Sequence, residues 1–443
     1  MTTLRLVWLF ARRSSSARST VVLPAVAFAV VTALLLIVEG GAQAFFSWTD
    51  GDALVYQLLA VVALSLLVVP LVALGGSAAR LSARRRDDRL AGLRLLGATP
   101  RLVRALTVIE STVVAAIGAL AGVAVYLLLA PLVGLIPFRG QPLGPSLLLA
   151  PTWVALTLLG VAALAALSAV VGLHGVVLSP LGVRTRQQAP RIHWLRAVIG
   201  IVVVGVVAAA MAALQVLAVS TTILLIVIAA GFGGTIAVLN LVGPWVLRLV
   251  ATGQARRART APRLLAARSI LESPKAAWRQ VSGVAMTSFM AVFAGIGVSL
   301  LDAAGADGDA GSTLVPDIRT GVIITVVASF VMVACSAGVN QAAAVLDRRD
   351  LYVSLDRIGM PVSAMNAARG RAVLSPLRIT AIGSALTAAI VLFPLTGASL
   401  LTAPLTLVVV AGCLAAGVLL VWAALRATSP VLARVLAEPS PSL

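Results

Sequence analysis

The sequence predicts an all-α, polytopic membrane protein with about ten transmembrane helices and both termini in the cytoplasm. Hydrophobic residues fill 60% of the 443 positions and charged residues only 11%, and the mean hydropathy is +1.07. One soluble core cannot bury this much apolar surface, so lipid must solvate a large part of it. The net charge of +19 would suit nucleic acid. The basic residues lie between apolar runs, however, and we expect no nucleic-acid partner.

Apolar runs of about 20 residues, the length that crosses a bilayer, define ten expected spans. They lie at 20–38, 55–79, 106–130, 151–178, 196–218, 221–247, 281–301, 319–343, 373–395 and 404–426. Several runs are longer than a bilayer requires, so we expect helices to tilt or to extend into the cytoplasm.

The distribution of basic residues gives the orientation. Of the 34 lysines and arginines, all but Arg139 and Arg319 fall in or beside the termini and alternate connections, which makes that side cytoplasmic. The outer connections are short and leave no room for a large external domain. We expect them at 39–54, 131–150, 219–220, 302–318 and 396–403, with acids such as Glu39 and Asp50 among them.

An internal repeat organises the chain. At a constant offset of 262 residues, the segment after the second span matches the segment after the eighth, through the pairs Arg86 and Arg348, Asp88 and Asp350, Leu93 and Leu355, and Gly97 and Gly359. We therefore predict a first four-helix unit over 1–190, a linking transmembrane pair with its cytoplasmic linker over 191–262, and a second, more divergent unit over 263–443. Both units then have the same topology, which disfavours carriers built from inverted repeats.

One cytoplasmic segment of the first unit stands out. Leu90, Leu93 and Leu96 alternate with Arg89 and Arg94 in a short amphipathic pattern. Gly97 then offers a left-handed stop, and Pro100 can begin the next helix. Such a helix can rest on anionic lipid or dock into a groove of another protein, and its charge alone does not decide between these.

This segment resembles a known signature. The run Leu93-Arg94-Leu95-Leu96-Gly97-Ala98, followed by a helix that contains Glu110, resembles the cytoplasmic loop of FtsX-like permeases, the MacB-type or type VII group of ATP-binding cassette (ABC) transporters. The chain is similar to their ten-span, two-repeat form without a large extracellular domain.

In that family the short helix couples the permease to an ATPase. The resemblance assigns this role to Arg89, Leu90, Leu93, Arg94, Leu96, Gly97, Ala98 and Pro100, and to Leu355, Ile358, Gly359 and Pro361 in the second copy. It gives Glu110 a structural or coupling role. The second copy departs from the pattern, because Asp356 replaces Arg94 and Ala372 replaces Glu110.

The resemblance implies a permease subunit in the inner (cytoplasmic) membrane. Its partners would be two copies of a separate ABC ATPase and membrane lipid, with one copy of this chain in each transporter. The substrate to be exported or extracted would be amphiphilic: a lipid, lipoprotein, antimicrobial peptide or drug. Two alternatives stay open, namely a signalling or scaffold protein driven by an ATPase without transport, and an ion-coupled secondary carrier.

The sequence carries no chemistry of its own that we can identify. It has no GxxxxGK[ST] phosphate loop, so ATP and Mg²⁺ are expected in the partner ATPase and no cofactor in this chain. His174 and His193 have no acidic or cysteine neighbours, so we expect no metal site. No serine or threonine has a histidine placed to activate it, and we expect a non-catalytic subunit.

Overall fold

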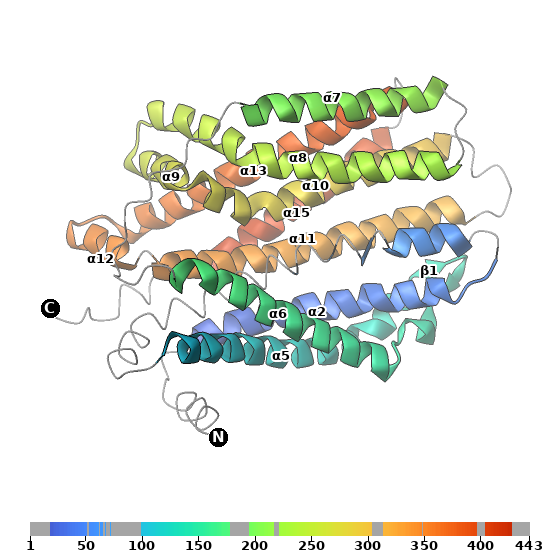
Figure 1. Ribbon diagram of the computed structural model, residues 1–443, viewed down its shortest axis with the longest axis horizontal. Coiled ribbons are helices and arrows are strands. Elements are labelled where there is room, and N and C mark those ends of the chain that lie inside the picture. The colour runs from blue at the N-terminus through green and yellow to red at the C-terminus, as the bar shows by residue number, and fades with distance from the viewer. Residues whose placement is uncertain are drawn as a thin grey trace. The chain divides into compact units, whose positions relative to one another are not determined.

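The computed structural model describes residues 18–50, 53–61 with 63, 64, 67 and 71, 99–177, 195–216, 221–303, 313–347, 349–396 and 404–427. These residues are almost entirely helical (Figure 1). By its contacts the chain divides into two compact units. The first comprises 1–185, 331–358 and 423–443, and the second comprises 186–330 and 359–422.

The first unit is built around three long helices. These are α2 (Arg18–Phe46), α5 (Pro100–Val133) and α6 (Pro151–Val177), which run side by side in Figure 1. Between α5 and α6 lie a two-residue-per-strand antiparallel hairpin, β1 (Pro137–Phe138) and β2 (Gln141–Pro142), and the 3-10 turn η2 (Gly144–Leu147). The described helices confirm the all-α prediction, and this hairpin is a small addition at one connection, where the turn residues Arg139 and Gly140 both have positive φ, as a type I′ hairpin turn requires.

Two glycines bring α5 against the backbone of α2. A Cβ at Gly118 would lie 2.5 Å from the carbonyl oxygen of Ala25, and a Cβ at Gly122 would lie 2.6 Å from that of Ala29. The spacing Gly-x-x-x-Gly puts both on one face of the helix. Within lipid the hydrophobic effect does not favour contact between helices, so close packing at small residues of this kind holds them together.

The second unit contains the linking pair α7 (Leu195–Val216) and α8 (Thr221–Arg256), the short helix α9 (Ala261–Glu272), and the long helices α10 (Pro274–Ala303) and α13 (Val362–Thr396). α13 packs on α7, α9 and α10. Phe289 of α10 and Ala388 of α13 form part of one buried hydrophobic cluster in this unit, and Phe232 of α8 packs against that cluster. Near the cytoplasmic ends, Gln254 Nε2 of α8 donates a 2.6 Å hydrogen bond to Ser375 Oγ of α13.

Three further helices complete the described chain. α11 (Leu314–Asp347) and α15 (Pro404–Ala427) contribute residues to both units, and α12 (Arg349–Arg357) belongs to the first. A Cβ at Gly417 of α15 would lie 2.2 Å from the ring of Phe330, so α15 and α11 also approach closely at a glycine.

The burial pattern repeats at the offset that the sequence indicates. α5 and α13 begin 262 residues apart, at Pro100 and Val362. The buried positions of α5 are matched, each 262 residues later, by buried positions of α13; in α5 they are 111, 114, 115, 118, 119, 122, 126 and 130. The packing is also equivalent, since α2 packs along α5 and α10 packs along α13. The predicted unit boundaries at 190 and 263 stay a prediction.

The expected spans agree with the described helices, with corrections at their ends. Among the described residues, eight helices are long and apolar enough to cross a membrane. Most of the predicted span 55–79 lies outside the described residues, and in α15 only Ala415–Ala424 qualifies, as a shorter apolar helix. The count of ten therefore stays a prediction. α5, α10 and α13 begin earlier than the apolar runs do, as expected for helices that extend into the cytoplasm.

We predict that the double substitution Gly118→Ala/Gly122→Ala destabilises the protein by about 1–3 kcal/mol, because each added methyl group meets backbone that cannot move aside. Thermal unfolding in detergent measures the effect. The matched control is Gly160→Ala on α6, where nothing lies within 4 Å of the added carbon. Alanine is the better helix former there, so this variant should unfold at the same temperature or higher. Equal behaviour of the two variants would contradict the close packing.

Candidate functional site

The first candidate coupling segment lies mostly outside the described residues. This holds for Arg89, Leu90, Leu93, Arg94, Leu96, Gly97 and Ala98. The description resumes at Thr99, whose hydroxyl accepts a 3.4 Å hydrogen bond from the backbone N–H of Leu102 and so caps α5. Pro100 is the first residue of that helix, which confirms the prediction that a helix begins there.

The second candidate segment can be followed residue by residue. α12 ends at Arg357, and the backbone N–H of Ile358 still donates to the carbonyl of Ser354 at 3.2 Å. The side chain of Ile358 is 78% exposed and that of Leu351 is 46% exposed, whereas Leu355 is half-buried. The short helix α12 and the residue after it thus present solvent-exposed apolar side chains beside charged ones.

The turn after α12 has the geometry that the sequence predicts. Gly359 has a φ of +83°, the left-handed conformation in which glycine ends helices. Pro361 precedes the first residue of α13, and its carbonyl accepts hydrogen bonds from the N–H groups of Ala364 (2.9 Å) and Met365 (3.2 Å). The backbone therefore fixes where the exposed Ile358 stands.

Gly359→Ala should destabilise this turn by about 1–2 kcal/mol, the cost of a Cβ in the left-handed region. Faster amide hydrogen exchange in α12 and the first turn of α13 reports the change. Gly370→Ala is the control, because Gly370 sits within helix α13 and has open space around it. Exchange rates that Gly359→Ala leaves at the wild-type level would refute the role of the turn.

Glu110 lies on α5 and is half-buried, and the neighbouring Ser111 is buried with its hydroxyl donating to the carbonyl of Val108 at 3.0 Å. The equivalent of Glu110 in α13 is Ala372, which is also half-buried. The carboxylate thus occupies a partly covered position in the first copy only. Its assignment as a structural or coupling acid remains a prediction.

At the opposite end of the first unit, the α5–α6 connection folds back over the helices. Tyr126 Oη of α5 donates to the carbonyl of Leu147 at 2.8 Å and accepts from the N–H of Leu149 at 2.9 Å. Leu147 is fully buried among Leu36, Ile37 and Tyr126. We call residues 134–149 the outer cap. Sequence reasoning treated this stretch as a plain connection, although its prolines and glycines signalled turns.

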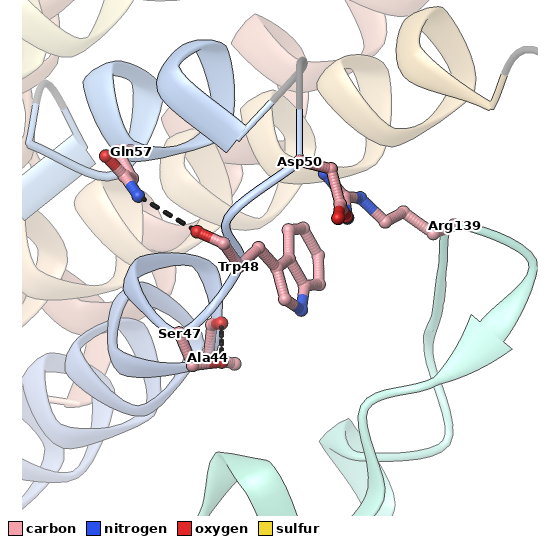
Figure 2. Close-up of polar contacts among 6 residues, drawn as sticks. All are labelled: Ala44, Ser47, Trp48, Asp50, Gln57 and Arg139. Carbon is pink, nitrogen blue, oxygen red and sulfur yellow. Dashed lines mark hydrogen bonds and ion pairs between the residues drawn. The ribbon is translucent and has the colours of Figure 1, made fainter.

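A cation, an acid and four aromatic rings join the outer cap to α2 and to the residues that follow it. The guanidinium of Arg139 lies 4.0 Å from the ring centroid of Trp48 and 4.9 Å from that of Tyr56, and it pairs with Asp50. Figure 2 shows Arg139 reaching from the hairpin to the chain that follows α2. The rings of Phe45 and Phe138 also meet, in a tilted contact with centroids 5.2 Å apart. One of the two basic residues expected outside is therefore held by specific contacts.

Glu39 corrects the predicted outer connection. It does not lie in a loop over 39–54, because α2 continues to Phe46. Its carboxylate accepts a hydrogen bond from Thr157 Oγ1 of α6. A charged group within a span is tolerated when a neighbouring helix supplies a polar partner. The predicted connection at 302–318 is likewise shorter, since α11 begins at Leu314.

We expect Arg139→Gln to loosen the outer cap. Asp50 is 70% exposed, so solvent screens the ion pair and the ring contacts supply most of the roughly 1 kcal/mol at stake. Amide exchange over residues 137–149 should then accelerate about fivefold. Arg139→Lys keeps the charge but loses the flat guanidinium that stacks on Trp48, so it should show an intermediate rate. The control is Arg319→Gln, which alters the other cation expected outside; the same acceleration in that control would show that charge alone acts.

The described helices define a class of protein: a multi-pass helical membrane protein. Among the described residues, no group of three histidine, cysteine or acidic side chains could hold a metal ion. Residues 59–177 match the family model of the FtsX-like permease C-terminal domain. Over this segment the chain is similar to the FtsX-like permeases, a family of non-catalytic membrane subunits that work with ATPase partners in ABC systems.

The matched segment includes the first candidate coupling segment, α5, the outer cap and α6. No curated protein matches the chain. The family thus defines the membrane subunit in general terms, and its cargo and coupling have to be argued from the residues.

Proposed function

We propose that this protein is the transmembrane subunit of a MacB-type ABC transporter that exports or extracts an amphiphilic substrate, with ATP and Mg²⁺ bound by separate ATPase subunits. The observation that carries the proposal is the family match over 59–177, which contains the amphipathic segment from Arg89 to Pro100. Two ATPase copies would then act on one copy of this chain in the inner membrane, one at each candidate coupling segment.

The equivalence of α5 and α13 supports two docking segments in one chain. Each helix begins directly after a candidate segment, and the two helices bury matching positions against α2 and α10. A push on the segment before α5 or α13 would therefore be transmitted along a long helix into the packed membrane core.

The second segment has the surface that a docking helix needs. Ile358 and Leu351 are exposed beside charged groups, and the turn at Gly359 fixes their position. An exposed apolar side chain on a short, charged helix is suited to an apolar groove in a partner. This is consistent with a second ATPase contact despite the departures at Asp356 and Ala372.

The short outer connections favour a cargo that is met within or beside the bilayer. In the described residues the connection between α5 and α6 is a compact cap, with no separate external domain. Cargo would therefore reach the helices through lipid, which suits an amphiphile such as a lipid, lipoprotein or membrane-active peptide or drug. The permease would move such molecules by rocking its helical units.

Co-purification with the cognate ATPase tests the docking. Leu93→Asp/Gly97→Pro should abolish recovery of the ATPase at the first segment, and Ile358→Asp should reduce the recovered ATPase from two copies to one. Burying a charge in an apolar groove is costly enough to prevent docking. The matched control Ile358→Leu keeps an apolar side chain of equal size and should retain both copies.

Unchanged recovery of the ATPase by a variant that combines Leu93→Asp, Gly97→Pro and Ile358→Asp would overturn the proposal. Transport itself is measured in proteoliposomes that contain permease and ATPase. ATP-dependent loss of a fluorescent amphiphile supports export, whereas ion-coupled flux without the ATPase would identify a secondary carrier. ATP turnover that responds to the permease without any flux would identify a signalling subunit.

A further inference from the structure

The cytoplasmic ends of α8 and α10 can be placed at the same height. Trp278 Nε1 of α10 donates a 3.1 Å hydrogen bond to Asn240 Oδ1 of α8, and a Cβ at Gly243 would lie 2.3 Å from the Trp278 ring. The first turn of α10 therefore lies beside residues 240–243 of α8. α9, which connects the two helices, packs on both.

Four exposed cations gather around this height, and we call them the proximal cations: Arg248, Arg268, Lys275 and Arg279. At 1.5 Å per residue, Arg248 stands only about 8 Å beyond Gly243 along α8. Lys275 and Arg279 flank Trp278 directly. Arg268 lies four helical residues before Glu272, the end of α9, and two further residues before the start of α10, which limits its distance from that start to about 13 Å.

The proximal cations carry an excess of positive charge over the acids near them in the sequence. Within the residues that the structure describes, none of the proximal cations forms an ion pair, and Glu272 is the one acid between residues 247 and 280. Leu249, next to Arg248, is 59% exposed. Positive charge in excess at the ends of the spans, beside an exposed apolar side chain, is complementary to an anionic lipid surface.

The height of the proximal cations argues for lipid over a soluble partner. The apolar runs of α8 and α10 end close to Leu247 and Val281, so the hydrocarbon boundary lies at this level and the headgroups just beyond it. Arg256 and Arg257, at the far end of α8, stand about 12 Å further out than Arg248, more than one Debye length.

We propose that the proximal cations form a binding surface for anionic phospholipid headgroups of the cytoplasmic leaflet. The surface belongs to the linking helices and α10, separate from the candidate coupling segments. It would hold this part of the second unit at a fixed depth and make the protein sensitive to the anionic lipid content of its membrane.

Quenching by brominated lipids tests the proposal on the full-length protein in vesicles. Leu249→Trp supplies a reporter, and the parent protein without it gives the background from the seven native tryptophans. Brominated phosphatidylglycerol should quench the introduced indole with about tenfold preference over brominated phosphatidylcholine at about 0.1 M ionic strength, where the Debye length is about 10 Å. The preference should fall when salt is raised.

Two double variants of equal charge separate height from charge. In the reporter background, Arg248→Gln/Lys275→Gln should reduce the preference for phosphatidylglycerol by about fivefold or more. Arg256→Gln/Arg257→Gln removes the same charge from the same region but further from the membrane, and should change the preference by less than twofold. Arg248→Lys, which retains the charge, should keep the preference and excludes a folding defect at that position.

Three results would overturn the proposal. Equal quenching by the two lipids would mean that headgroup charge is not recognised. Equal loss in the two double variants would mean that only net charge matters. The absence of quenching by either lipid would show that this surface faces water or an acidic protein, such as the ATPase.

Discussion

Close contact between helix backbones at small residues is the interaction on which this structure depends. Lipid tails are as apolar as the side chains, so burying apolar side chains between helices gains little hydrophobic free energy. Helices therefore associate where their surfaces pack closely. Gly118 and Gly122 let α5 touch the carbonyls of Ala25 and Ala29, and the equivalent positions of α13 carry Thr380 and Ser384. The hydroxyls of these two residues bond carbonyls within their own helix, so they add little bulk or unmet polarity to the interface.

This packing gives the proposed coupling a mechanical basis. A helix that is held along its length against a neighbour can carry a displacement from its cytoplasmic start into the membrane. α13 begins shortly after the turn at Gly359 and is joined to α8 by the bond from Gln254 to Ser375, near the start of its apolar run. At the other end of the first unit, the outer cap closes over α2 and α5 through Tyr126 and Arg139.

The two functional surfaces that we propose use charge in different ways. At Ile358 the charged neighbours flank an apolar side chain that would enter a partner's groove. At the proximal cations the positive charge itself would recognise the anionic headgroup. The nearby exposed Leu249 would add only an apolar contact with the lipid. Height along α8 separates a lipid-facing cation such as Arg248 from a distal one such as Arg256. The excess of basic residues, which first served to orient the chain, therefore contains groups with distinct physical roles.

The sequence by itself predicted the multi-pass helical class, because crossing lipid demands long apolar runs, and the 262-residue offset that recurs in the buried positions of α5 and α13, whereas its count of ten spans and its cytoplasmic orientation stay predictions. It also placed the helix start at Pro100 and the left-handed turn at Gly359. Only the tertiary structure decided which face of α5 is buried, since a helix that is apolar all round carries no pattern to show it. The helical position of Glu39 beside Thr157, the ring contacts of Arg139 and the height of Arg248 relative to Trp278 depend on the same information. Each joins residues distant in sequence, through packing geometry that no local pattern encodes.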